Sequence, residues 1–117
     1  MATLDRNIDE RLYDEIVRRL VEAVGPDEII LFGSRARGNA RQDSDIDLLL
    51  IKDSSEPPHR RVIQAYRALV GLGVPKDILW RTPAEVQEWR NVSNHVISRA
   101  LREGRVLVAA WRCRELL

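Results

Sequence analysis

The stretch "LFGSRARGNARQDSDIDLLL", residues 31–50, combines groups that bind anions with groups that repel them. Gly33 and Ser34, with the arginines that follow, suit a phosphate, because glycine lets the backbone approach a ligand and guanidinium groups pair with phosphate oxygens. Asp45 and Asp47 would repel the same ligand. A divalent cation resolves the conflict, because Mg²⁺ binds carboxylate oxygens together with phosphate oxygens and water. The stretch therefore predicts a site for a metal-bound nucleoside triphosphate.

The acidic residues are expected to converge. Asp45 and Asp47 begin an apolar run that reads as a strand, so their side chains point to one face, about 7 Å apart. Two such carboxylates should repel each other, and one should resist ionising. Asp77, in "PKDILW", is a candidate third carboxylate if its strand runs parallel to that of Asp47. The alternatives are solvated acids at a strand edge for the pair and a strand-start cap for Asp77.

Three carboxylates can hold two cations about 4 Å apart, an arrangement suited to in-line displacement at phosphorus. One ion would activate an attacking hydroxyl and the other would hold the triphosphate. Arg35, Arg37 and Arg41 could neutralise the charge that develops on the leaving pyrophosphate. The alternative for each arginine is a solvated position in a polar loop.

The elements that must position these residues follow from apolar spacing and turn signals. We expect, in chain order, a helix over 8–24, a strand over 28–32, a polar segment over 33–44 with room for a helical turn, a strand over 45–51, a helix over 59–71, a strand over 76–80, helices over 83–89 and 92–103, and an extended piece over 105–110. The buried face of the helix over 59–71 is assigned to Val62, Ile63, Tyr66, Leu69 and Val70. Thr82 should cap the helix that Pro83 begins.

The strand directions follow from the site. The first strand ends at Gly33 and the second begins at the aspartates, so the two should be antiparallel if both face one ligand. The third strand should lie parallel to the second so that Asp77 reaches the pair. The second strand, apolar on both faces after Asp47, should be central. The order predicts an α/β fold with a small mixed sheet and helices packed on it.

Composition limits the class of protein. The 117 residues carry a formal net charge of +1, which provides no basic field for direct nucleic-acid binding. The single cysteine, Cys113, fits a reducing cytoplasm. No apolar run resembles a signal peptide or a membrane span, so we expect a cytoplasmic protein formed by one domain over 1–117.

The motif Gly33-Ser34, residues 35–44, Asp45-Ile46-Asp47 resembles the signature of the DNA polymerase β-like nucleotidyltransferase superfamily. The fuller stretch, together with Asp77-Ile-Leu and the "REGRVL" ending, is similar to the minimal nucleotidyltransferases, often encoded beside a HEPN-domain partner. The resemblance implies that Asp45, Asp47 and Asp77 bind the metal ions and that Gly33 and Ser34 bind the triphosphate. It implies Mg²⁺, two ions, and ATP as substrate.

The resemblance also implies a function. In such pairs the nucleotidyltransferase is the antitoxin, and AMP passes from ATP to a tyrosine of the HEPN ribonuclease toxin. Two alternatives stay open: an antitoxin that neutralises its partner by binding alone, and a nucleotidyltransferase that modifies a small molecule. We expect no second domain of the kind that larger members use to hold the acceptor, and the residues given leave the acceptor undefined.

Overall fold

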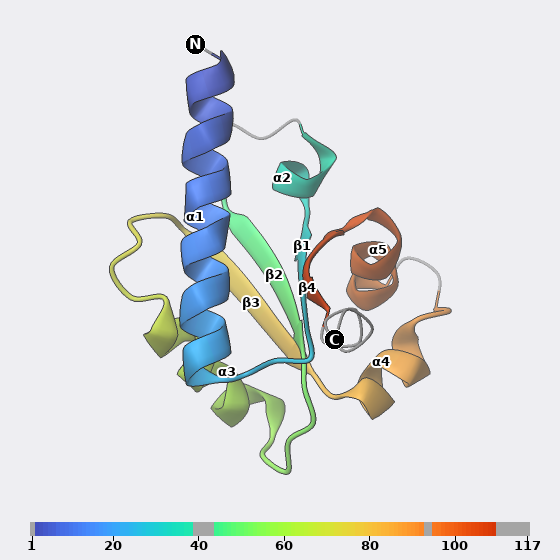
Figure 1. Ribbon diagram of the computed structural model, residues 1–117. Helices are drawn as coiled ribbons and strands as arrows, with labels where there is room; N and C mark the ends of the chain where they lie inside the picture. Colours follow the sequence, from blue (N-terminus) through green and yellow to red (C-terminus); the bar gives the residue numbers. More distant parts are fainter. Residues whose placement is uncertain (1, 39–43, 93–94, 110–117) are drawn as a thin grey trace, which may run out of the picture.

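The computed structural model describes residues 2–38, 44–92 and 95–109, which form a mixed sheet with helices on both faces (Figure 1). In chain order the elements are α1 (Ala2–Ala23), β1 (Glu28–Phe32), α2 (Ser34–Arg37), β2 (Ile46–Ile51), α3 (Pro58–Ala68), β3 (Lys76–Arg81), α4 (Pro83–Trp89), α5 (Val96–Glu103) and β4 (Arg105–Ala109). The predicted α/β class is confirmed.

The strands of the described residues lie in the order β3-β2-β1-β4. β1 and β2 are antiparallel, and β2 and β3 are parallel, as the site argument predicted. β4 pairs antiparallel with the other side of β1. β2 is therefore central, which explains why its side chains are apolar on both faces.

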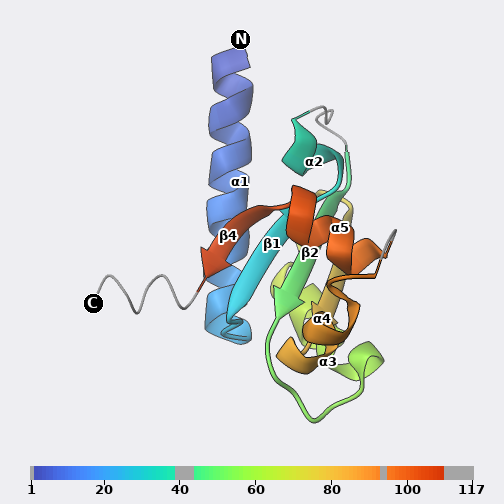
Figure 2. The ribbon, with the colours of Figure 1, turned by 90° about the vertical axis from the view of Figure 1, so that its right-hand side faces the viewer.

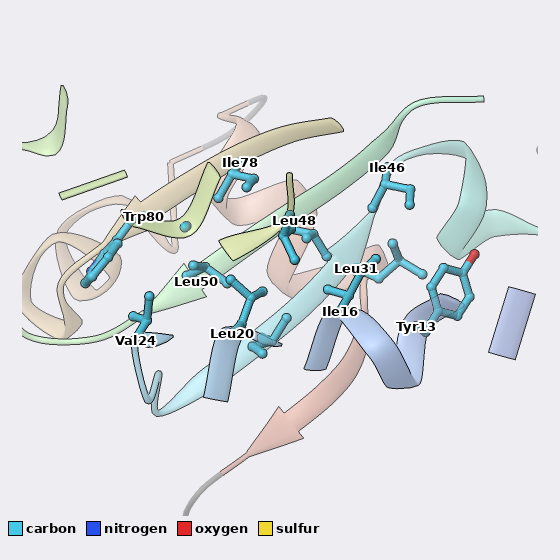
Figure 3. Packing of buried hydrophobic residues seen from close by; sticks show 13 residues of the cluster. Tyr13, Ile16, Leu20, Val24, Leu31, Ile46, Leu48, Leu50, Ile78 and Trp80 are labelled. Carbon is cyan, nitrogen blue, oxygen red and sulfur yellow. The ribbon is translucent and has the colours of Figure 1, made fainter. Parts of the chain in front are cut away.

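α1 and α3 cover one face of the sheet, and α4 and α5 cover the other (Figure 2). Figure 3 shows the core beneath α1, where Ile16 and Leu20 meet Leu48 and Leu50 of β2. The smaller core on the opposite face contains Leu49 of β2. Alternation along β2 thus places Ile46, Leu48 and Leu50 toward α1 and α3, and Asp47, Leu49 and Ile51 toward α4 and α5.

Several predicted boundaries were wrong. β2 begins at residue 46, not 45, and α5 begins at residue 96, not 92. The helix predicted over 8–24 extends back to residue 2 as α1, in line with the helical character of the N-terminal residues. His95 explains the later start of α5, because its Nδ1 accepts from the Ile97 amide at 3.2 Å and so caps the helix at that point.

The assigned face of α3 was also partly wrong. The helix ends at residue 68, and Ile63 and Val70 are 45% and 70% exposed. Arg61 and Ala65 are buried instead. The burial of Arg61 was not predicted because its ion-pair partner Glu85, 2.6 Å away, lies on α4.

α4 begins as predicted. The Thr82 side chain accepts from the Glu85 amide at 3.2 Å, and Glu85 Oε1 accepts from the Thr82 amide at 2.7 Å. Burial alone would raise the pKa of Glu85, but the Thr82 amide and Arg61 together lower it. The cap and the ion pair join α4 to α3 at the end of β3.

Gly104 sets the height of α5 above the sheet. A Cβ at this position would stand 2.3 Å from the Ala100 carbonyl oxygen and 2.4 Å from Ile30 Cγ2. The junction between α5 and β4 therefore packs on β1 more closely than any side chain would allow. In the part of the chain that the structure describes, no helix has the length and apolar character needed to cross a bilayer.

Candidate functional site

Gly33 ends β1 directly beside Asp47. The pairing of β1 with β2 places Phe32 opposite Asp47, so the next residue meets the aspartate side chain. Gly33 has φ of 76°, and a Cβ there would stand 2.3 Å from Asp47 Oδ2. Only glycine satisfies both conditions, because the left-handed conformation and the close carboxylate each exclude a side chain. The chain thus turns sharply into α2 with its backbone against a carboxylate.

Asp47 and Asp77 are paired residues of two parallel strands. Their Cα atoms are partners in the register of β2 and β3, so both side chains face the α4 and α5 side of the sheet. Asp45 lies two residues earlier, just before β2, and is exposed like Asp77, whereas Asp47 is partly buried. The structure therefore brings the three predicted acids to one end of the sheet.

The pKa of Asp47 is affected by its burial and by the two neighbouring acids. Burial raises the pKa of Asp47 above its ordinary value, and the negative charges of Asp77 and Asp45 raise it further. The positive charge of Arg37 opposes these effects in part. The structure supports the predicted resistance to ionisation and assigns it to Asp47.

The acids fit a divalent cation in the chemistry of their donors and in the side of the sheet they share. A cation bound between neighbouring carboxylates would offset the repulsion between their negative charges. Among the described residues, however, no group of three or more His, Cys, Asp or Glu side chains is gathered closely enough to hold an ion. A bound ion would therefore require the three side chains to converge further.

The predicted arginines occupy different settings. Arg35 is buried, and its Nε donates to the carbonyl oxygen of Ser44 at 3.0 Å. This contact joins α2 to the backbone just before Asp45. Arg37 is half-exposed, and its Nη1 lies 4.0 Å from Glu103 Oε2 on α5. Arg41 lies outside the described residues.

A pocket of about 220 Å³ opens beside Gly33. It lies between the end of β1 and α5, and its lining is formed by Phe32, Gly33, Arg37, Val96, Arg99 and Glu103. Phe32 and Val96 offer apolar surface, and Arg37 and Arg99 offer positive charge beside the carboxylate of Glu103. The apolar side chains suit an apolar body, and the two arginines suit an anionic group.

Sequence reasoning missed the three residues that α5 contributes to this pocket. Val96, Arg99 and Glu103 are spaced by three and four residues and so share one helix face. The neighbouring face, with Ile97 and Ala100, is buried against the sheet. The spacing was a usable signal, but only the fold places this face opposite Gly33.

Comparison with known proteins identifies the family. Residues 13–107 match the sequence profile described as the nucleotidyltransferase domain. A curated relative from Methanocaldococcus jannaschii, named "Putative protein adenylyltransferase MJ1305", is 39% identical over 61 residues. That match covers 50% of this chain and 40% of the relative, so the chain spans less than half the length of the curated relative it matches.

Solved structures share the fold. The chain is similar to a toxin–antitoxin crystallised with AMP-PNP, with a TM-score of 0.63 and 21% identity over 89% of this chain and 78% of that one. It is also similar to a mutant of the MntA–HpeT toxin–antitoxin, with a TM-score of 0.61 and 18% identity over the same shares.

Proposed function

Because the chain belongs to the nucleotidyltransferase domain family, we propose that it transfers AMP from ATP to a hydroxyl of a partner protein. The acceptor is a tyrosine of a HEPN ribonuclease toxin in the cytoplasm, and the chain acts as the antitoxin. The observation that carries the proposal is the meeting of Gly33, Asp47 and Asp77 at one end of the sheet, beside a pocket lined by arginines.

The carboxylates of Asp45, Asp47 and Asp77 would hold Mg²⁺, with two ions as the expected number. The ions, when bound, supply charge neutralisation at the transferred phosphoryl group and acidify the attacking hydroxyl. Asp47 is the central ligand, because it faces both Gly33 and Asp77. Burial, followed by the negative charges of Asp77 and Asp45, raises its pKa, and a bound cation would favour its ionised form.

The pocket on the α5 side holds the nucleotide. Gly33 and Ser34 contact the triphosphate, and Arg37 and Arg99 provide two positive charges at the same opening. Phe32 and Val96 offer apolar surface to the nucleoside. Arg35 donates a hydrogen bond to the Ser44 carbonyl oxygen and so fixes the backbone directly before Asp45.

The reaction forms a bond between the acceptor oxygen and the α-phosphorus of ATP and breaks the bond from that phosphorus to the bridging oxygen of pyrophosphate. The hydroxyl proton passes to one of the three carboxylates, and pyrophosphate leaves beside the arginines. Asp45 and Asp77 are exposed, so an acceptor on the surface of a large partner can reach them. This access favours a protein acceptor.

Two observations on related proteins support the choice of acceptor. The curated relative carries the name of a protein adenylyltransferase, and the structural neighbours are toxin–antitoxin complexes. A chain that neutralised its partner by contact alone would have no need for three repelling carboxylates.

Labelled ATP tests the proposed reaction. The chain is incubated with Mg²⁺, a candidate HEPN partner and ATP that carries the label either on the α-phosphate or on the γ-phosphate. Transfer of the α-label alone supports nucleotidyl transfer. Transfer of the γ-label would show a kinase and contradict the proposal. Label recovered on a small molecule, with none on the partner, would contradict the protein acceptor.

A further inference from the structure

Tyr66 contacts the edge of the sheet next to the third aspartate. β3 is an edge strand among the described residues, so the outward-facing backbone groups of β3 lack a strand partner. The amide of Ile78 donates to the Tyr66 hydroxyl oxygen at 2.9 Å. A side chain of α3 thus provides the hydrogen bond that a further strand would otherwise supply.

The same hydroxyl faces Asp77. Tyr66 Oη lies 3.4 Å from Asp77 Oδ1. An amide can only donate and an ionised carboxylate can only accept, so the hydroxyl accepts from Ile78 and its own proton is available to Asp77. At 3.4 Å the bond to Asp77 is longer than a strong O–H···O bond. The hydroxyl therefore orients the Asp77 carboxylate through a weak hydrogen bond. The carboxylate stays free to bind a metal ion.

Tyr66 itself is well placed for this task. α3 packs on the α1 side of the sheet, and the Tyr66 side chain is packed against the core that contains Ile78 and Trp80. Asp77 belongs to the opposite, α4 and α5, side. The contact passes around the edge of β3 and joins the two layers at the point where the acids meet.

We propose that Tyr66 is a positioning residue that fixes the orientation of Asp77 for cation binding. The proposal rests on the assignment of Asp77 as a metal ligand under the proposed function. It explains how an exposed carboxylate on an edge strand keeps a defined orientation. In this account Tyr66 acts through Asp77 and touches neither nucleotide nor acceptor.

The test compares Tyr66→Phe, which keeps the ring and removes the hydroxyl, with Tyr13→Phe, which removes a hydroxyl from the same core on α1. Binding of Mn²⁺ is followed by electron paramagnetic resonance in the presence of an ATP analogue that cannot be cleaved between the α- and β-phosphates. We expect Tyr66→Phe to weaken Mn²⁺ binding by about tenfold, the lower end of the effect of a lost second-sphere hydrogen bond. Tyr13→Phe should leave it unchanged.

A double-mutant cycle separates positioning from general stability. Asp77→Asn should weaken Mn²⁺ binding, and Tyr66→Phe should add no further loss in the Asp77→Asn background. Equal losses from Tyr66→Phe in both backgrounds would overturn the proposal, because the hydroxyl would then act independently of Asp77. An unchanged Mn²⁺ affinity in Tyr66→Phe would also overturn it, whatever happens to thermal stability.

The readout does not depend on the acceptor. Mn²⁺ binding with the analogue can follow the cycle even if no partner protein is modified, so failure of the protein-transfer hypothesis and failure of the positioning role are distinguished. In a working transfer assay, Tyr66→Phe should lower kcat and raise the Mg²⁺ concentration for half-maximal rate, with the KM for ATP unchanged.

Discussion

The backbone of Gly33 lies so close to the carboxylate of Asp47 that a Cβ on Gly33 would stand 2.3 Å from Asp47 Oδ2. This contact joins the end of β1 to Asp47, which is paired with Asp77 across β2 and β3. It also means that the glycine is required twice, by its φ of 76° and by the carboxylate. The two requirements can be separated by mutation.

Gly33→Ala should therefore abolish activity and lower stability by about 2 kcal/mol, within the range for a strained backbone with a displaced neighbour. Gly73→Ala is the matched control, because Gly73 has a φ of 73° and a Cβ added there would meet nothing within 4 Å. It should lower stability by about 1 kcal/mol and leave activity intact. Chemical denaturation and a transfer assay measure both effects. Equal losses of activity in the two variants would contradict a specific role for the Gly33 contact.

The raised pKa of Asp47 predicts that the stability of the metal-free protein depends on pH. Burial and the charges of Asp77 and Asp45 disfavour the ionised form in the folded state, so the folded protein binds more protons than the unfolded chain between the ordinary pKa of an aspartate and the raised one. Stability should fall as pH rises through that interval and remain lower above it.

Asp47→Asn removes the ionisable group and with it this loss of stability. In EDTA at neutral pH the variant should melt at a higher temperature than the wild type, and the difference should shrink as the pH falls below the ordinary aspartate range. Added Mg²⁺ and ATP should reverse the order by stabilising the wild type alone. Thermal unfolding at several pH values measures this. A variant that is less stable than the wild type at neutral pH without metal would contradict the account.

The pocket beside Gly33 predicts a role for Arg99. Arg99→Gln should raise the KM for ATP about tenfold, the effect expected from the loss of one charge-assisted hydrogen bond of about 1.4 kcal/mol. Arg102→Gln is the control, because Arg102 Nε donates to the Ser98 carbonyl at 3.4 Å and lies outside the pocket lining. Steady-state kinetics compare the two variants. If both variants raise the KM for ATP equally, the effect comes from the positive charge of α5 in general, and a specific role of Arg99 in the pocket is contradicted.

Glu85 should be important for stability but not for chemistry. Glu85→Ala removes the reciprocal cap of α4 and leaves Arg61, which is 2% exposed, without its carboxylate. The expected cost is about 3 kcal/mol, as for a buried charge that loses its partner. Thr82→Ala, which removes the cap alone, should cost about 1 kcal/mol.

Activity per folded molecule should be unchanged in both variants, because α4 begins where β3 ends, at the opposite end of that strand from Asp77. Urea denaturation and kinetics below the transition provide the two readouts. Similar costs for Glu85→Ala and Thr82→Ala would show that the Arg61 pair contributes little.

Sequence reasoning predicted best where local chemistry decides the structure. The strand over 28–32 and the helix over 83–89 have the predicted bounds, because Gly33 ends one and Thr82 with Pro83 begins the other. The pairing directions were also predictable, since one ligand had to be reached from the ends of three strands. The structure confirms both directions.

Features that depend on distant residues were not predictable. Arg61 was not assigned to the buried face of α3 because Glu85 is far along the chain. Val70 was assigned to the core because aliphatic spacing does not show that α3 ends at residue 68. The face of α5 with Arg99 gained meaning only from its position opposite Gly33. The roles assigned to the site residues stay predictions until the variants are measured.

The central claim is tested most directly by the intact mass of the HEPN partner after incubation with the chain, ATP and Mg²⁺. The control is the variant Asp45→Asn with Asp47→Asn. The account predicts a mass gain of one or more AMP units on the partner, located on a tyrosine by peptide mapping and absent with the control. An unmodified partner that is nevertheless silenced in a stable complex, with wild type and control alike, would contradict the account and show an antitoxin that works by binding alone.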